Sequence, residues 1–93
     1  MKLPATATLE ETAELAQALP AEVAAGSGVL TVDASALATF DSSAIALLLQ
    51  ARRLAQAAGR GFAVHGAPPK LAELAALYGV VELLSLDGSD GTA

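Results

Sequence analysis

Apolar residues in the first third of the chain follow an alternating period and then a helical one. Residues 3–8 alternate, which is typical of a short strand, and Pro4 indicates a sheet edge or a strand start. Thr8 and Glu11 have the spacing of a capping box, so we expect a helix to begin near Leu9. Pro20 lacks an N–H group and is expected to kink or restart that helix. The apolar face of this helix continues at Leu15, Leu19 and Val23.

The middle third predicts a buried strand, a loop and the clearest helix of the chain. Residues 29–33 are a short apolar, β-branched run, as expected for a buried strand. Residues 33–41 are expected to form a connecting loop anchored by Leu37 and Phe40. The next helix ends at Gly59, and its apolar face has the spacing of one helical stripe: Ala44, Leu47, Leu48, Ala51, Leu54, Ala55 and Ala58.

The last third predicts one more strand and one more helix. Residues 61–65 have the pattern of a strand, and the two prolines at 68 and 69 suit the start of a helix that ends at Gly79. Residues 80–86 fit either a last strand or a final turn. The buried stripe of the predicted helix consists of Leu71, Leu74, Ala75 and Tyr78.

Strands and helices therefore alternate, which favours parallel strands joined by crossover helices. We expect a single α/β domain over residues 1–86, with a small, mostly parallel sheet and helices packed against it. Residues 87–93 (DGSDGTA) are rich in glycine, aspartate and serine and are expected to form a flexible C-terminal tail.

Composition narrows the possible functions. The 93 residues are 54% apolar and 16% charged, which suits one packed domain. The net charge of −5 and the absence of a basic run argue against nucleic acid and against an anionic membrane as direct partners. We expect no direct insertion into a membrane, because no apolar run approaches the length of a span. Without cysteine, the chain has neither disulfides nor thiol chemistry, and a cytoplasmic location fits.

Catalytic and metal-binding patterns are missing from the sequence. His65 is the only histidine and has no carboxylate at helical spacing, so a structural role is expected. A triad of Ser42, His65 and Asp41 has no elbow motif behind it. The glycine pairs lack the spacing of phosphate-binding loops. We therefore predict no enzyme activity, no catalytic residues, no metal site and no cofactor.

The segment from Phe40 to Ile45 is the most informative part of the chain. Asp41 or Ser42 is expected to cap the following helix, because its oxygen can accept from free N–H groups there. Two hydroxyls and a carboxylate gather at this positive helix end. The helix is also apolar beyond its stripe, at Ile45 and Leu49, on the side it shares with Arg52 and Gln56. That second side is either covered by a neighbouring helix or forms a contact surface, and the residues alone favour neither.

Residues 32–48 (VDASALATFDSSAIALL) resemble the signature of the STAS family, a D-x-S-x-(3–5)-D-[ST]-[SG]-G-[LI] pattern that leads into a helix. The resemblance continues to the Leu77-Tyr78-Gly79 helix end and covers about residues 3–86. It implies a non-catalytic docking domain of STAS-like fold. STAS domains include anti-sigma factor antagonists, in which a partner kinase phosphorylates the hydroxyl at the position of Ser42. They also include the Mla-type subunit of the bacterial phospholipid-transport ABC complex, which the C-terminal segment resembles more.

The resemblance implies a surface for a partner protein, with Ser42 as the candidate phosphoacceptor. The leading partner is the ABC transporter ATPase subunit, which would hold the chain at the inner membrane. The alternative is a serine kinase or anti-sigma factor. Two features depart from the family: Ala44 replaces the usual glycine, and the extra leading strand of typical STAS domains is expected to be missing. A homodimer or a partner is therefore expected to cover the sheet edge. The predicted partner surface is Thr39, Phe40, Asp41, Ser42, Ser43, Ile45, Leu49 and Arg52.

Overall fold

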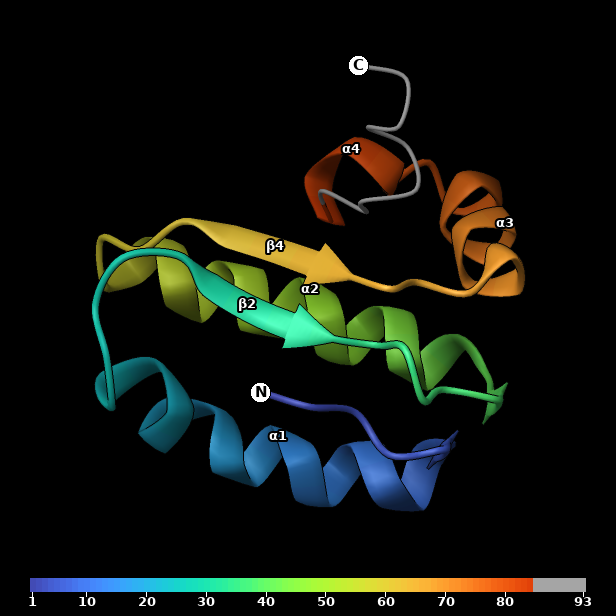
Figure 1. Ribbon diagram of the computed structural model, residues 1–93, viewed down its shortest axis with the longest axis horizontal. Coiled ribbons are helices and arrows are strands. Elements are labelled where there is room, and N and C mark those ends of the chain that lie inside the picture. The colour runs from blue at the N-terminus through green and yellow to red at the C-terminus, as the bar shows by residue number, and fades with distance from the viewer. Residues whose placement is uncertain (85–93) are drawn as a thin grey trace.

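In the computed structural model, which describes residues 1–84, β2 (Leu30–Asp33) lies between two parallel neighbours (Figure 1). On one side it pairs with β4 (Phe62–His65), with Val32 opposite Val64. On the other side lie the first residues of the chain: the Asp33 N–H donates to the Met1 carbonyl at 2.8 Å, and the Leu3 N–H donates to the Asp33 carbonyl at 2.8 Å. The strands therefore run parallel, as the sequence predicts.

A second parallel pair continues from the N-terminal segment. β1 (Thr6–Ala7) pairs with β3 (Thr39–Phe40). At the start of β3, the N–H groups of Ala38 and Thr39 both donate to the Ala5 carbonyl, at 2.8 and 2.9 Å. The expected loop over residues 33–41 thus contains a short strand. Its partner is more than thirty residues away in sequence, so no local pattern predicts it.

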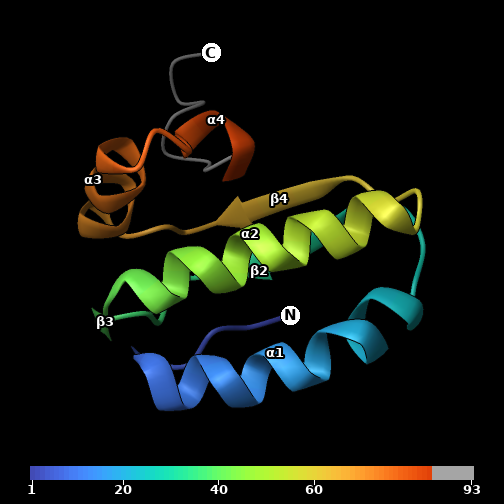
Figure 2. The same ribbon diagram turned by 180° about the vertical axis from the view of Figure 1, so that it is seen from behind.

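One face of the strands is covered by a helix. α2 (Ser42–Ala57) lies behind β2 and β4 in Figure 1, and α1 (Leu9–Ala24) lies beside α2 (Figure 2). No helix of the described part crosses the front of these two strands (Figure 1). Leu30 and Val32 of β2 are buried, whereas Thr31 between them is exposed. The alternation is that of a strand with one face on the core and one face toward solvent.

Two C-terminal helices complete the described fold. α3 (Pro69–Leu77) begins at the predicted prolines, and α4 (Val81–Leu84) takes the place of the expected last strand or turn. Leu71 of α3 and Leu84 of α4 are both fully buried. Among residues 1–84, no helix is long and apolar enough to cross a membrane. The tail predicted over residues 87–93 lies outside the described residues.

α2 is the central helix of the core, with α1 on one flank and the pair α3–α4 on the other (Figure 2). Most of its predicted stripe is buried, including Leu48, which is 1% exposed. α1 runs unbroken through Pro20, contrary to an expected restart there. The proline is exposed, on the side of α1 away from the core. The largest fully buried side chains are Leu3, Leu19, Ile45, Leu48, Leu71, Leu84, Val32 and Val64.

Candidate functional site

Two aspartate turns shape the corner that leads into α2. The Asp33 carboxylate accepts from the N–H of Ser35 at 2.9 Å, which turns the chain at the end of β2. The loop from β4 to α3 passes directly against this turn, because an added Cβ at Gly66 would lie 2.8 Å from the Ser35 Cβ. Leu37 is buried and fixes the loop between the two turns.

The second turn is the cap of α2. The Asp41 carboxylate accepts from the N–H of Ser43 at 2.9 Å and also from the Ser43 hydroxyl. These hydrogen bonds lower the pKa of Asp41 below its ordinary value. The bond from the Ser43 side chain has the larger effect, and the bond from the Ser43 backbone has the smaller one. Asp41 is therefore the cap, and Ser42 is the first residue of the helix, with its side chain exposed.

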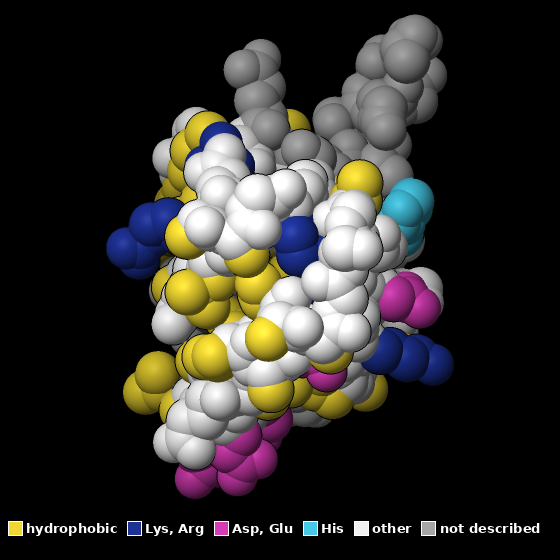
Figure 3. Space-filling model, turned by 90° about the vertical axis from the view of Figure 1, so that its left-hand side faces the viewer, with side chains coloured by type: hydrophobic (Ala, Val, Ile, Leu, Met, Phe, Trp, Pro, Cys, Tyr) yellow, Lys and Arg dark blue, Asp and Glu magenta, His cyan; other side chains and the backbone are white. Residues whose placement is uncertain are grey.

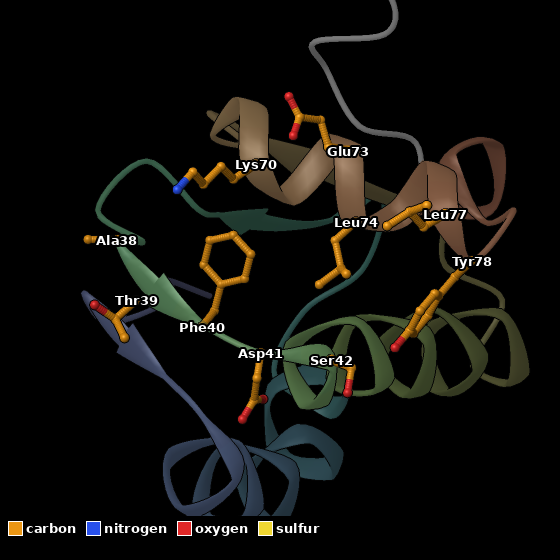
Figure 4. Close-up of a pocket in the computed structure, with 10 residues that line it drawn as sticks. All are labelled: Ala38, Thr39, Phe40, Asp41, Ser42, Lys70, Glu73, Leu74, Leu77 and Tyr78. Atoms are coloured by element: carbon orange, nitrogen blue, oxygen red, sulfur yellow. The ribbon is translucent and has the colours of Figure 1, made fainter.

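An open groove of about 620 Å³ lies between this corner and α3 (Figure 4). One wall consists of the last loop residues, β3 and the start of α2. The other wall is one face of α3, formed by residues that lie three or four positions apart along the helix. Ten residues line the groove: Ala38, Thr39, Phe40, Asp41, Ser42, Lys70, Glu73, Leu74, Leu77 and Tyr78.

Apolar side chains face one another across the groove. Figure 4 shows the Phe40 ring and the Leu74 side chain pointing into it from opposite walls. Both side chains are half-buried, whereas Leu77 is 80% exposed and Tyr78 is 53% exposed. Together with Phe40 and Leu74 they form a contiguous apolar surface, which is typical of a contact site.

The groove includes four of the eight residues predicted for the partner surface: Thr39, Phe40, Asp41 and Ser42. Ser43 instead lines a smaller hollow of about 180 Å³ between α1 and α2. Leu49 and Arg52 are half-buried on α2 and line neither space.

Ile45 does not belong to an exposed surface. Its side chain is 1% exposed and forms part of the core. The sequence shows that α2 is apolar on two sides, and the α3–α4 pair supplies the cover for that flank. At Ile45, the second apolar side of α2 is therefore explained by a covering helix and not by a contact surface.

The α3 wall was absent from the predicted surface. The sequence places Leu74 and Tyr78 in the buried stripe of α3, but only Leu71 and Ala75 are buried among its residues. The available signal was Leu77, an apolar residue outside the predicted stripe.

The single histidine lies away from the groove. His65 ends β4 on the exposed side of the strands, at the right of Figure 3, where it appears in cyan. It lies opposite Asp33 in the strand register, and its charge is one minor contribution to the lowered pKa of that aspartate, after the hydrogen bonds from Ser35. Among the described residues, no three side chains of the metal-binding types come together. The groove offers apolar contact, the hydroxyls of Thr39, Ser42 and Tyr78 and the ammonium group of Lys70, which suits binding.

Comparison with models of protein families gives one match over most of the chain. Residues 1–85 match the family model described as Mlab, STAS domain. A comparison with curated proteins gave no match.

Proposed function

The chain belongs to the STAS domain family, and from that premise we propose that it binds and regulates the ATPase subunit of a phospholipid-transport ABC transporter of the Mla type. STAS domains in general are non-catalytic domains that mediate contacts between proteins. The matching model carries the description Mlab, which supports the transport branch. We further propose that the domain spans residues 1–86 and works in the cytoplasm, at the inner membrane through its partner.

The groove between α3 and the start of α2 carries this proposal. It joins the predicted surface from Thr39 to Ser42 to a second wall of exposed apolar residues, Leu77 and Tyr78. Its lining combines exposed apolar side chains with polar ones, as the contact surfaces of proteins do.

Regulation requires no chemistry in the domain itself. A domain that binds one conformational state of an ATPase more tightly shifts the population toward that state. The shift cannot exceed the difference in binding free energy between the two states. The hydrogen bonds from Ser43 hold Asp41 in place at the start of α2, which lowers the ordering cost of binding at that wall of the groove.

The test is binding of the purified chain to the ATPase subunit of its host's phospholipid-transport complex, measured by calorimetry. We expect a complex in wild type and weaker binding in Ser42→Glu, because the added carboxylate is charged and bulky at the groove. Ser27→Glu is the matched control, because Ser27 is an exposed serine in the loop after α1. Absence of a complex in wild type would refute the proposed function, and equal loss in both variants would refute the placement of the interface.

An alternative function is that of an anti-sigma factor antagonist switched by phosphorylation. The observation that favours it is the exposed Ser42 hydroxyl at the first position of α2. A phosphate there would add nearly two negative charges beside Asp41. Phosphorylation of Ser42 by a serine kinase of the host, with release of a bound anti-sigma factor, would establish this alternative and displace the transport function.

A further inference from the structure

We propose that the groove between the β3–α2 corner and α3 receives a helix of the partner that carries an apolar stripe and, at the Lys70 end, a carboxylate. This inference rests on the proposed function for the existence of a protein partner. It adds the shape and the charge of the segment that the partner inserts.

The groove holds a cation that its own carboxylates do not face, in a chain with a net charge of −5. Two of its lining residues are acidic, and both turn away from it: Asp41 points toward α1 and is held by Ser43, and Glu73 points outward from α3 (Figure 4). Lys70 is the single cation in the lining. No ion pair joins Lys70 to another residue within 1–84, so its charge is available to a partner.

Lys70 also occupies an unfavourable place in its own helix. It lies in the first turn of α3, where a cation opposes the helix dipole, and no acidic residue is present in that turn. A carboxylate from a partner would neutralise the Lys70 ammonium group and also interact favourably with the positive end of the α3 dipole. The attraction is therefore strongest at the end of the groove where Phe40 and Lys70 lie together (Figure 4).

The apolar contacts fit a helix. Leu74, Leu77 and Tyr78 form a ridge on α3 at intervals of three and four residues, and Phe40 stands opposite. A ridge of this spacing packs against the ridge of a second helix. An enclosed small-molecule site buries most of its ligand, whereas Leu77 is 80% exposed at this groove.

The probe is a pair of designed helical peptides. Both carry leucines at i, i+4 and i+7, and they differ only in a glutamate or a lysine at one end of the stripe. Binding is followed by amide chemical shifts of the ¹⁵N-labelled chain. We expect the glutamate peptide to bind more tightly, by roughly two- to fivefold as for an exposed ion pair, with shifts centred on Phe40, Ser42, Lys70 and Leu77.

The two lysines of the chain provide matched variants. Lys70→Glu is expected to reverse the preference between the peptides, whereas Lys2→Glu, in the segment beside β2, is expected to keep it. Leu77→Ser should weaken both peptides by about tenfold, as for a contact residue of an interface. Leu9→Ser removes a leucine that is 71% exposed on α1 and is expected to leave binding unchanged.

Several results would overturn this inference. Equal binding of the two peptides would do so, as would the same effect from both lysine variants. Chemical-shift changes confined to the α1–α2 hollow would place the peptide elsewhere. Groove shifts that depend on protein concentration alone would indicate that a second copy of the chain occupies the groove. With the ATPase, loss of binding in Ser42→Glu but not in Lys70→Glu would refute this inference and leave the proposed function intact. If the peptides show the expected preference but no ATPase complex forms, the proposed function is refuted and this inference stands.

Discussion

At the scale of single residues, Gly66 shows how the corner of the site is built. Its φ is +71°, and a Cβ there would lie 2.8 Å from the Ser35 Cβ and 3.1 Å from the Ser35 Cα. Gly79 has nearly the same φ, +70°, but nothing lies within 4 Å of its added Cβ. Substitution of Gly79 therefore tests the cost of the backbone conformation alone, whereas substitution of Gly66 adds the cost of close packing against Ser35.

We predict that Gly66→Ala is more destabilising than Gly79→Ala. The conformational strain alone is worth about 1–2 kcal/mol at either position. The clash with Ser35 adds about 1–3 kcal/mol at Gly66, because backbone atoms are involved and cannot move aside cheaply. Urea unfolding of the two variants measures the difference. Equal losses would mean that the turn at Ser35 adapts freely and does not fix the corner.

The sequence predicts single-residue roles well where the cause is local. Residue types a few positions apart limit the cap of α2 to Asp41 or Ser42, and the structure assigns it to Asp41. The capping box of α1 is likewise local, with Glu11 accepting from the Thr8 N–H at 3.0 Å. Exposure is predicted less well. Ile45 is buried and Tyr78 is exposed because burial depends on which helix lies alongside, and a helical period does not contain that information.

At the scale of elements, the end of α1 depends on a residue far away in sequence. The last turn of α1 contains no basic residue. The Arg60 guanidinium supplies the missing cation, because it donates to the carbonyls of Val23 at 2.7 Å, Gly28 at 3.0 Å and Glu22 at 3.3 Å. The sequence shows only a Gly-Arg-Gly turn at this point, so the contact could not be predicted locally.

Replacing Arg60 tests this link between the α2–β4 turn and α1. Arg60→Met keeps most of the aliphatic stem and removes every donor, so we expect the free energy of unfolding to fall by about 1–3 kcal/mol, as for hydrogen bonds to a charged group. Arg53→Met is the control, because Arg53 is exposed on α2. Chemical denaturation monitored by circular dichroism gives both values. Identical stability of the two variants would show that the Arg60 contacts contribute nothing.

The N-termini of α1 and α2 make stability depend on pH. Hydrogen bonds from Thr8 lower the pKa of Glu11, and hydrogen bonds from Ser43 lower that of Asp41. A carboxylate whose pKa is lower in the folded state binds its proton more readily when the chain is unfolded. Its contribution is therefore complete above the ordinary carboxyl pKa and is lost as the pH falls through the folded value.

We expect the urea midpoint of wild type to be constant near neutral pH and to fall below about pH 5, where unfolded carboxyl groups begin to bind protons. The double variant Glu11→Gln, Asp41→Asn should show a lower midpoint at neutral pH and a shallower fall in acid. A fall of the same steepness in the double variant would assign the acid sensitivity to other carboxylates, such as Asp33, whose pKa is also lowered.

At the scale of the whole molecule, alternation of strands and helices was enough to predict the parallel α/β arrangement. The details that escaped prediction are those made by distant partners: β3 pairs with the N-terminal segment, and α4 closes the flank of α2. The groove falls in the same category. Its first wall is a local sequence feature, whereas its second wall, α3, reaches it through tertiary packing.

Adjacent leucines on α2 test whether the domain unfolds as one unit around that helix. Leu48 is 1% exposed and faces the centre of the core, whereas Leu49 is half-buried on the outer side. Leu48→Ala is expected to cost about 2–5 kcal/mol, a large part of the roughly 5–15 kcal/mol that stabilises a domain of this kind. Leu49→Ala removes the same atoms from a site that water partly reaches, so its cost should be clearly smaller. Because α2 contacts α1, β4, α3 and α4, the loss in Leu48→Ala should appear equally in probes placed at α1 and at α3. Unfolding of α3 at a lower urea concentration than α1 would instead show that the second wall of the groove is a separate, less stable unit.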